Sequence, residues 1–81
     1  DVIACANGLP YGLTASVWSG DLTRAHRVAH AIESGVVWIN QHGPRPLGVP
    51  IGGFKASGSG KELSIEELES YTRLKTVMVR L

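Results

Sequence analysis

The 81-residue sequence has little of several residue types, and each shortage excludes a class of protein. Its single cysteine, Cys5, excludes an internal disulfide and a thiolate zinc cluster, which makes a reducing compartment the default. No apolar run approaches the roughly 20 residues that cross a bilayer, and no secretory signal opens the chain. The net charge is only +1, and the Lys and Arg residues are scattered instead of gathered in a stripe. We therefore expect a cytoplasmic protein that binds neither membrane nor nucleic acid.

The beginning of the sequence looks incomplete. The chain starts at Asp1 without an initiator methionine, and its first residues read as the last turns of a helix that stops near Asn7 and Gly8. Its only methionine is Met78. We interpret the chain as a piece of a longer polypeptide.

The middle of the sequence indicates an α/β fold. A β-rich segment at residues 13–19 is followed by Asp21, a good N-cap, and by an apolar helical stripe that Gly35 should close. Residues 36–39 are four consecutive apolar residues, so we expect a strand buried on both faces, as in a parallel sheet. Strand, helix and strand in this order predict a right-handed βαβ unit.

The second half contains a long loop and two further elements. Residues 41–62 are rich in glycine and proline and almost free of predicted regular structure, which is typical of a functional loop. Ser64 and Glu67 form the pattern of a capping box at the start of a short helix. Residues 71–81 are β-rich and predict a final strand.

The glycine-rich segment "PIGGFKASGSGKE" raises the question of phosphate binding. A Walker loop would need Gly where Lys55 stands and a hydroxyl where Glu62 stands, and a dinucleotide loop would need Gly at Leu63. We therefore expect no phosphate site. The glycines are better explained by positive φ angles and close backbone approach in a crowded place.

Two other features look chemical and are better explained structurally. His26 and His30 lie one helical turn apart, but Arg27 stands where a zinc protease has its glutamate, and a metal site needs three or four ligands. A solvated helix flank and no metal are expected. Cys5 has no histidine near it in sequence, so we expect a small buried hydrophobic residue and no nucleophile.

The start of the long loop is the better candidate site. Ligands of open α/β sheets bind beyond the carboxyl ends of the strands, and His42 and Arg45 follow such an end. Pro44 and Pro46 would hold the Arg45 guanidinium in a fixed position suited to a carboxylate. An ordinary exposed arginine in a surface loop explains the sequence equally well.

Three motifs together resemble the C-terminal end of the NAD(P)-dependent aldehyde dehydrogenase superfamily. They are "YGLTASVWSGDLTRAHRVAHAIESGVVWIN", "PIGGFKASGSGKE" and "LESYTRLKTV", and the likeness covers essentially all 81 residues. The resemblance implies oxidation of an aldehyde through a cysteine thiohemiacetal, hydride transfer to NAD or NADP, and thioester hydrolysis assisted by a glutamate. Cys5 and the glutamates of this chain do not match the family's catalytic residues. The resemblance thus implies that this chain alone is inactive and holds no cofactor.

The resemblance also implies a role for the loop after the Trp-x-Asn strand end, which in the family walls part of the substrate tunnel. By position this wall falls on Gln41, His42, Gly43, Pro44, Arg45 and Ile51. The chain departs from the common family pattern at Ile51, where many members have Phe, at Phe54, where Tyr is frequent, and at Lys61, where Arg is frequent. Without an aromatic residue at position 51, an aromatic cage around the substrate is not expected.

The likeness implies that residues 1–70 are the end of the catalytic domain and residues 71–81 an oligomerisation strand. In the family this strand pairs with a neighbouring subunit, so a dimer or tetramer is expected, with the remainder of the polypeptide as the other partner. An exposed apolar strand is independently suited to adding onto a sheet edge. The alternative is a standalone truncated protein that works as an interaction module by strand addition. The reading frame upstream of Asp1 would separate the two.

Overall fold

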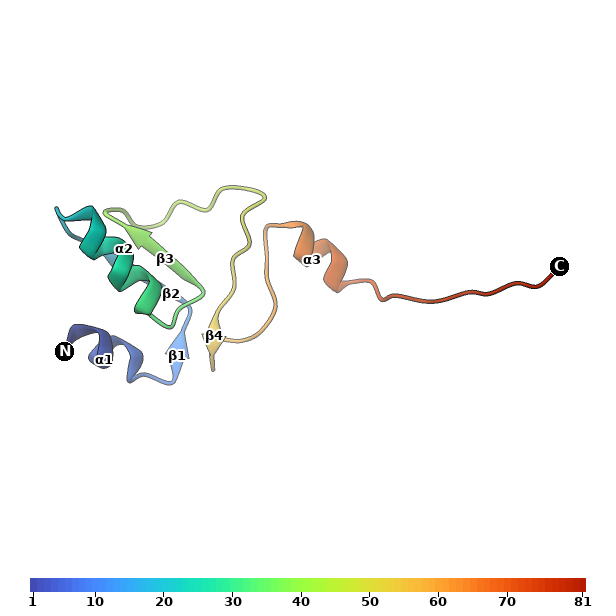
Figure 1. Cartoon of the computed structure of the whole chain (residues 1–81), viewed down its shortest axis with the longest axis horizontal. Helices are drawn as coiled ribbons and strands as arrows, with labels where there is room; N and C mark the ends of the chain where they lie inside the picture. Colours follow the sequence, from blue (N-terminus) through green and yellow to red (C-terminus); the bar gives the residue numbers. More distant parts are fainter.

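The computed structural model describes residues 1–81 and has an elongated shape (Figure 1). The elements in chain order are α1 (Val2–Asn7), β1 (Tyr11–Gly12), β2 (Thr14–Val17), α2 (Leu22–Ala31), β3 (Val36–Ile39), β4 (Phe54–Lys55) and α3 (Ile65–Ser70). The elements from α1 to β4 gather in one body, whereas α3 and the C-terminal segment extend away from it. The radius of gyration is 17.4 Å, compared with about 12 Å for a compact domain of this length.

The centre of the body is a strand, helix and strand unit. β2 pairs in parallel with β3 from Thr14↔Val36 to Val17↔Ile39, and α2 connects the two strands. Asp21 caps α2 as expected, because its side chain accepts a hydrogen bond of 3.0 Å from the Arg24 N–H. The α/β character predicted from the sequence is confirmed.

The helix α2 ends earlier than the sequence predicts. It stops at Ala31, four residues before Gly35, because Ile32 already has extended backbone angles. The amide of Asn7 donates to the Ala31 carbonyl at 2.8 Å and thus satisfies an acceptor that the helix end leaves open. The expected stop at Gly35 was therefore wrong, because the chain leaves the helical conformation at Ile32.

The hydrophobic core is very small. Only three residues are buried, namely Gly12, Ala25 and Trp38. The expectation of a strand buried on both faces is not met within this chain, since the other three residues of β3 are only half-buried. The sheet of β2 and β3 has just two strands. Large apolar side chains such as Trp18 remain exposed on the molecule.

The long loop contains slightly more regular structure than the sequence predicts. Residues 54–55 form β4, which pairs antiparallel with β1, and Ile51 forms an isolated bridge with Glu62. The explanation for the glycines of this segment is confirmed: a Cβ at Gly52 would lie 2.1 Å from the Gly60 carbonyl oxygen. Gly58 has φ +122°, a value that side chains rarely adopt.

The short helix α3 begins at the expected place with a different cap. The Ser64 hydroxyl donates to the Glu66 carboxylate, and the Glu67 carboxylate accepts from the Leu63 N–H at 3.0 Å. The predicted capping box between Ser64 and Glu67 was therefore wrong. The hydrogen bond from Ser64, followed by one from the Glu66 backbone N–H, lowers the pKa of Glu66 below its usual range.

The C-terminal segment, residues 72–81, belongs to no helix or strand and extends away from the body (Figure 1). Its apolar side chains, including Leu74, Met78 and Leu81, are exposed. A strand needs a neighbouring strand, and no part of this chain pairs with the segment. The final strand therefore stays a prediction. None of the three helices combines the length and the hydrophobicity that crossing a bilayer requires.

The close approach at Gly35 generates a stability prediction. We expect Gly35→Ala to lower the free energy of unfolding by about 3 kcal/mol or to prevent folding, since the new methyl group would overlap the Gly52 carbonyl. Thermal and denaturant unfolding of the complete protein measure the effect. The control is Gly20→Ala, where nothing lies within 4 Å of the added Cβ, and its effect should stay within about 0.5 kcal/mol. Equal stability of both variants would contradict the packing argument.

Candidate functional site

The candidate site begins where the parallel strands β2 and β3 end. The Asn40 N–H donates to the Val17 carbonyl at 2.8 Å and so adds one more rung after Ile39. The Asn40 side chain clamps Ser19, accepting from its N–H at 2.9 Å and donating to its carbonyl at 3.0 Å. Asn40 also has φ +54°, a left-handed conformation that asparagine tolerates better than most residues. The loop therefore leaves the sheet in a fixed direction.

Trp38 holds the first residues of this loop. Its indole N–H donates to the Pro44 carbonyl at 3.0 Å, and its ring meets the His42 ring edge-on with centroids 4.9 Å apart. The His42 Nδ1 is also 3.1 Å from the Ser16 hydroxyl on β2. Sequence reasoning missed Ser16 and the role of Trp38. A signal existed for Trp38, because a buried indole N–H usually finds a hydrogen-bond partner.

Three of the four predicted site residues line one or both of two cavities. Gln41 and Ile51 line a cavity of about 220 Å³ beside β3, together with Trp38 and several prolines. Arg45 and Ile51 line another of about 450 Å³ against the glycine-rich loop. Ile51 thus belongs to both cavities, whereas His42 lines neither and lies against Trp38 and Ser16.

The larger cavity carries charges of both signs. Arg45 and Lys61 contribute cations, and Glu62 and Glu67 contribute carboxylates. Arg45 forms no salt bridge within the chain. A ligand that entered this cavity would meet a guanidinium and carboxylates together, so repulsion by the two glutamates would oppose the attraction of Arg45 for a negatively charged ligand.

The glycine-rich loop does not have the geometry of a phosphate cradle. The N–H groups of Gly58 and Glu62 donate to carbonyls of the loop itself, at 3.3 Å to Lys55 and 2.7 Å to Ile51. A Cβ at Gly52 would lie 2.1 Å from the Gly60 carbonyl oxygen, so this approach is filled by the chain's own backbone. These residues do not fit the pyrophosphate of a nicotinamide cofactor, which needs N–H groups that point at the ligand.

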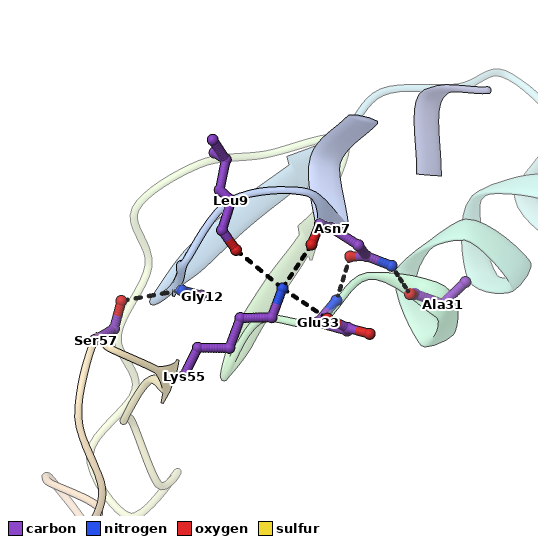
Figure 2. Close-up of polar contacts among 7 residues, drawn as sticks. All are labelled: Asn7, Leu9, Gly12, Ala31, Glu33, Lys55 and Ser57. Atoms are coloured by element: carbon purple, nitrogen blue, oxygen red, sulfur yellow. Dashed lines mark hydrogen bonds and ion pairs between the residues drawn. The ribbon is translucent and has the colours of Figure 1, made fainter. Parts of the chain in front are cut away.

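A further polar cluster was missed by sequence reasoning, and Figure 2 shows it. The Lys55 ammonium donates to the Asn7 carbonyl at 2.7 Å and the Leu9 carbonyl at 3.2 Å, and it pairs with the Glu33 carboxylate at 2.6 Å. The sequence presented Lys55 only as a mismatch to a phosphate loop. Its partners lie far away in the sequence, so no local pattern indicated them.

The remaining candidates stay outside the site. Cys5 is exposed on α1, so the expectation of a buried hydrophobic residue was wrong. None of the residues of α1 is buried in this chain, Cys5 included. His26 and His30 stack along α2 with ring centroids 6.4 Å apart. No group of three or more His, Cys, Asp or Glu side chains converges in this chain in a way that could hold a metal ion.

Comparison with known proteins gives a consistent match. The model of the aldehyde dehydrogenase family matches residues 1–77. An aldehyde dehydrogenase from Bacillus cereus, solved with NAD+, is 41% identical with a TM-score of 0.89 over 99% of this chain and 16% of that chain. A mutant indole-3-acetaldehyde dehydrogenase from P. syringae, solved with NAD+ and IAA, is 42% identical with a TM-score of 0.88 over the same shares.

A betaine aldehyde dehydrogenase from Staphylococcus aureus, solved without a cofactor, is 46% identical with a TM-score of 0.83. The match covers 86% of this chain and 14% of that chain. The chain therefore spans no more than 16% of the length of any of these three relatives.

Proposed function

Since the chain belongs to the aldehyde dehydrogenase family, we propose that it is the C-terminal part of an enzyme that oxidises an aldehyde to a carboxylic acid. The observation that carries this proposal is the family match over residues 1–77, together with identities above 40% to solved aldehyde dehydrogenases. Two of these relatives were solved with NAD+, which supports a nicotinamide cofactor as the hydride acceptor of the complete enzyme.

We propose that the chain contributes to substrate binding through the loop that follows β3. Gln41, His42, Arg45 and Ile51 would form part of the wall of the aldehyde passage. Ile51 lies between the two cavities, and Gln41 and Arg45 each line one of them. His42 would supply a polar group whose orientation depends on Trp38 and Ser16. In this role the residues orient the aldehyde and exclude water, and they form no bond to it.

We propose that the chain is inactive alone. Its one cysteine is exposed on the outside of α1, and the covalent and hydride-transfer steps of the family depend on residues that do not match this chain. The loop that looks most like a nucleotide site is filled by its own backbone, so the cofactor contacts are expected elsewhere in the polypeptide. The small core supports dependence on a larger body, because only three residues are buried.

We propose that residues 71–81 are an assembly strand, distinct from the catalytic part in residues 1–70. The segment is extended and exposes apolar side chains, including Val77, Val79 and Leu81, without a partner strand in this chain. Such a segment gains hydrogen bonds and burial by adding to the edge of another subunit's sheet. The same feature also favours the alternative of a standalone module that docks by strand addition.

The first prediction concerns activity. We expect the complete protein to reduce NAD+ or NADP+ in the presence of an aldehyde, and the isolated 81-residue chain to show no turnover, because the reaction needs both the thiolate and the cofactor site. Formation of reduced cofactor followed by absorbance measures both. Turnover by the isolated chain would contradict its inactivity, and the lack of aldehyde oxidation by the complete protein would overturn the proposed function.

The second prediction concerns Arg45. If Arg45 binds a carboxylate on the substrate, Arg45→Ala should raise KM about tenfold or more for an aldehyde bearing a carboxylate and leave KM for a neutral aldehyde of similar size nearly unchanged. Steady-state kinetics of the complete enzyme with the two substrates measures the difference. Arg24→Ala on α2 is the matched control. Equal effects of Arg45→Ala on both substrates would leave Arg45 as an ordinary surface residue.

The third prediction concerns assembly. Deletion of residues 71–81 from the complete enzyme should convert a dimer or tetramer into smaller species, since the strand and its apolar contacts would be lost. Light scattering after size-exclusion chromatography measures the mass. The control replaces Arg73 with Ala and keeps the strand. An unchanged oligomer after the deletion would show that assembly depends on other surfaces.

A further inference from the structure

Three residues other than glycine have positive φ angles. All three lie close to the loop of residues 41–53, which contains the candidate site residues. Asn40, with φ +54°, stands at its start, and Lys55, with φ +54°, stands just beyond its end. Leu63, with φ +61°, accepts from the Gly48 N–H in the middle of the loop at 2.6 Å. Such conformations persist only where the surroundings hold them, and they cluster at functional sites. The loop is therefore an element whose shape the fold specifies closely.

Of these three residues, Lys55 has the side chain with the most polar contacts. An ammonium group has three N–H donors, and here three oxygens surround it: the carbonyls of Asn7 and Leu9 and the carboxylate of Glu33. Figure 2 shows the three contacts converging on the Lys55 nitrogen. The side chain is 26% exposed, so these charge-assisted bonds are partly shielded from water.

The same cluster joins three parts of the chain. The Asn7 amide donates to the Ala31 carbonyl at 2.8 Å and accepts from the Glu33 N–H at 2.8 Å, which ties the end of α1 to the end of α2. Lys55, a residue of β4, contacts Asn7 at the end of α1 and Glu33 just after α2, and so connects β4 to both helix ends. Since Asn40 is clamped to Ser19 at the other end, the loop between them is a span with two anchors.

We propose that Lys55 is a positioning residue that sets the shape of the loop of residues 41–53 and thereby the affinity for the aldehyde. This inference rests on the proposed function. Lys55 lines neither of the two cavities, so it acts through the loop. Gly52 and Gly53, which immediately precede β4, line the larger cavity and follow Ile51 directly. A shift of β4 against α1 and α2 would therefore move Ile51, the residue shared by both cavities.

The test uses the complete enzyme with three variants of Lys55. Lys55→Met removes the ammonium and keeps a side chain in the left-handed conformation, whereas Lys55→Gly removes the ammonium and the backbone strain together. Both should raise KM for the aldehyde about tenfold, with kcat and the KM of the cofactor within about twofold of the parent. Lys55→Arg keeps the charge and should restore part of the aldehyde affinity.

Variants of the partner test the network. Glu33→Gln should raise the aldehyde KM by less than Lys55→Met, because the ammonium keeps its two carbonyl acceptors. In the double variant Lys55→Met with Glu33→Gln, the two effects should be less than additive, since both changes break the same contact. The matched control is Glu69→Gln on α3, whose carboxylate takes part in no salt bridge, and it should leave the kinetics unchanged.

Hydrogen exchange measured by mass spectrometry gives a readout that does not depend on activity. Amides of residues 41–53, including the Gly48 and Ile51 N–H groups, should exchange faster in Lys55→Met and Lys55→Gly than in the parent or in Glu69→Gln. If the parent enzyme oxidised no aldehyde, the proposed function would fail and the exchange would still test the anchoring of the loop. Unchanged exchange, or faster exchange with an unchanged aldehyde KM, would overturn the role of Lys55. An equal loss of kcat, aldehyde affinity and cofactor affinity would overturn it as well.

Discussion

The close crossing of Gly35 and Gly52 is the constraint on which the rest of the body depends. The two backbones approach so closely that a Cβ at Gly35 would lie 1.4 Å from the Gly52 carbonyl oxygen. Gly12 lies in the same crowded place, where its own Cβ would lie 2.2 Å from the Glu33 carbonyl oxygen. The absence of side chains lets the Gly12 N–H donate to the Ser57 hydroxyl at 3.0 Å and the Gly35 N–H donate to the Gly12 carbonyl at 3.1 Å. Side chains at these positions would separate β1, β3 and the glycine-rich loop.

Backbone and polar contacts hold the body together because apolar burial within the chain is small. Ala25 and Trp38 are the only buried apolar side chains, although the hydrophobic effect is usually the dominant favourable term in folding. Trp38 combines both kinds of contact, since its ring packs on His42 while its N–H holds Pro44. Exposed side chains such as Trp18 and Leu74 would gain free energy by burial against further protein. This balance agrees with a chain that spans a small share of its relatives.

The elements that could be predicted from the sequence are those with local signals. The Asp21 cap and the apolar stripe of α2 are local patterns, and so is the run of apolar residues in β3. The early end of α2 had no such signal, because the Ala31 carbonyl at that end is bound by Asn7, 24 residues earlier in the sequence. The role of Lys55 was hidden for the same reason, as the Asn7 carbonyl lies 48 residues away. The predicted cap of α3 failed for a different reason: the Ser64 hydroxyl donates to the Glu66 carboxylate and forms no hydrogen bond that caps the helix.

The candidate site shows the same division between local and distant causes. The loop after β3 became the candidate site through the rule that ligands of α/β sheets bind beyond the carboxyl ends of the strands. Its internal arrangement did not follow, because it depends on how Trp38, Ser16 and the glycine-rich loop meet in space. The segment that resembled a phosphate loop therefore has a structural function. Its Gly52 allows the close crossing with Gly35, and its Lys55 fastens β4 to the ends of α1 and α2, so the segment supports the loop that follows β3.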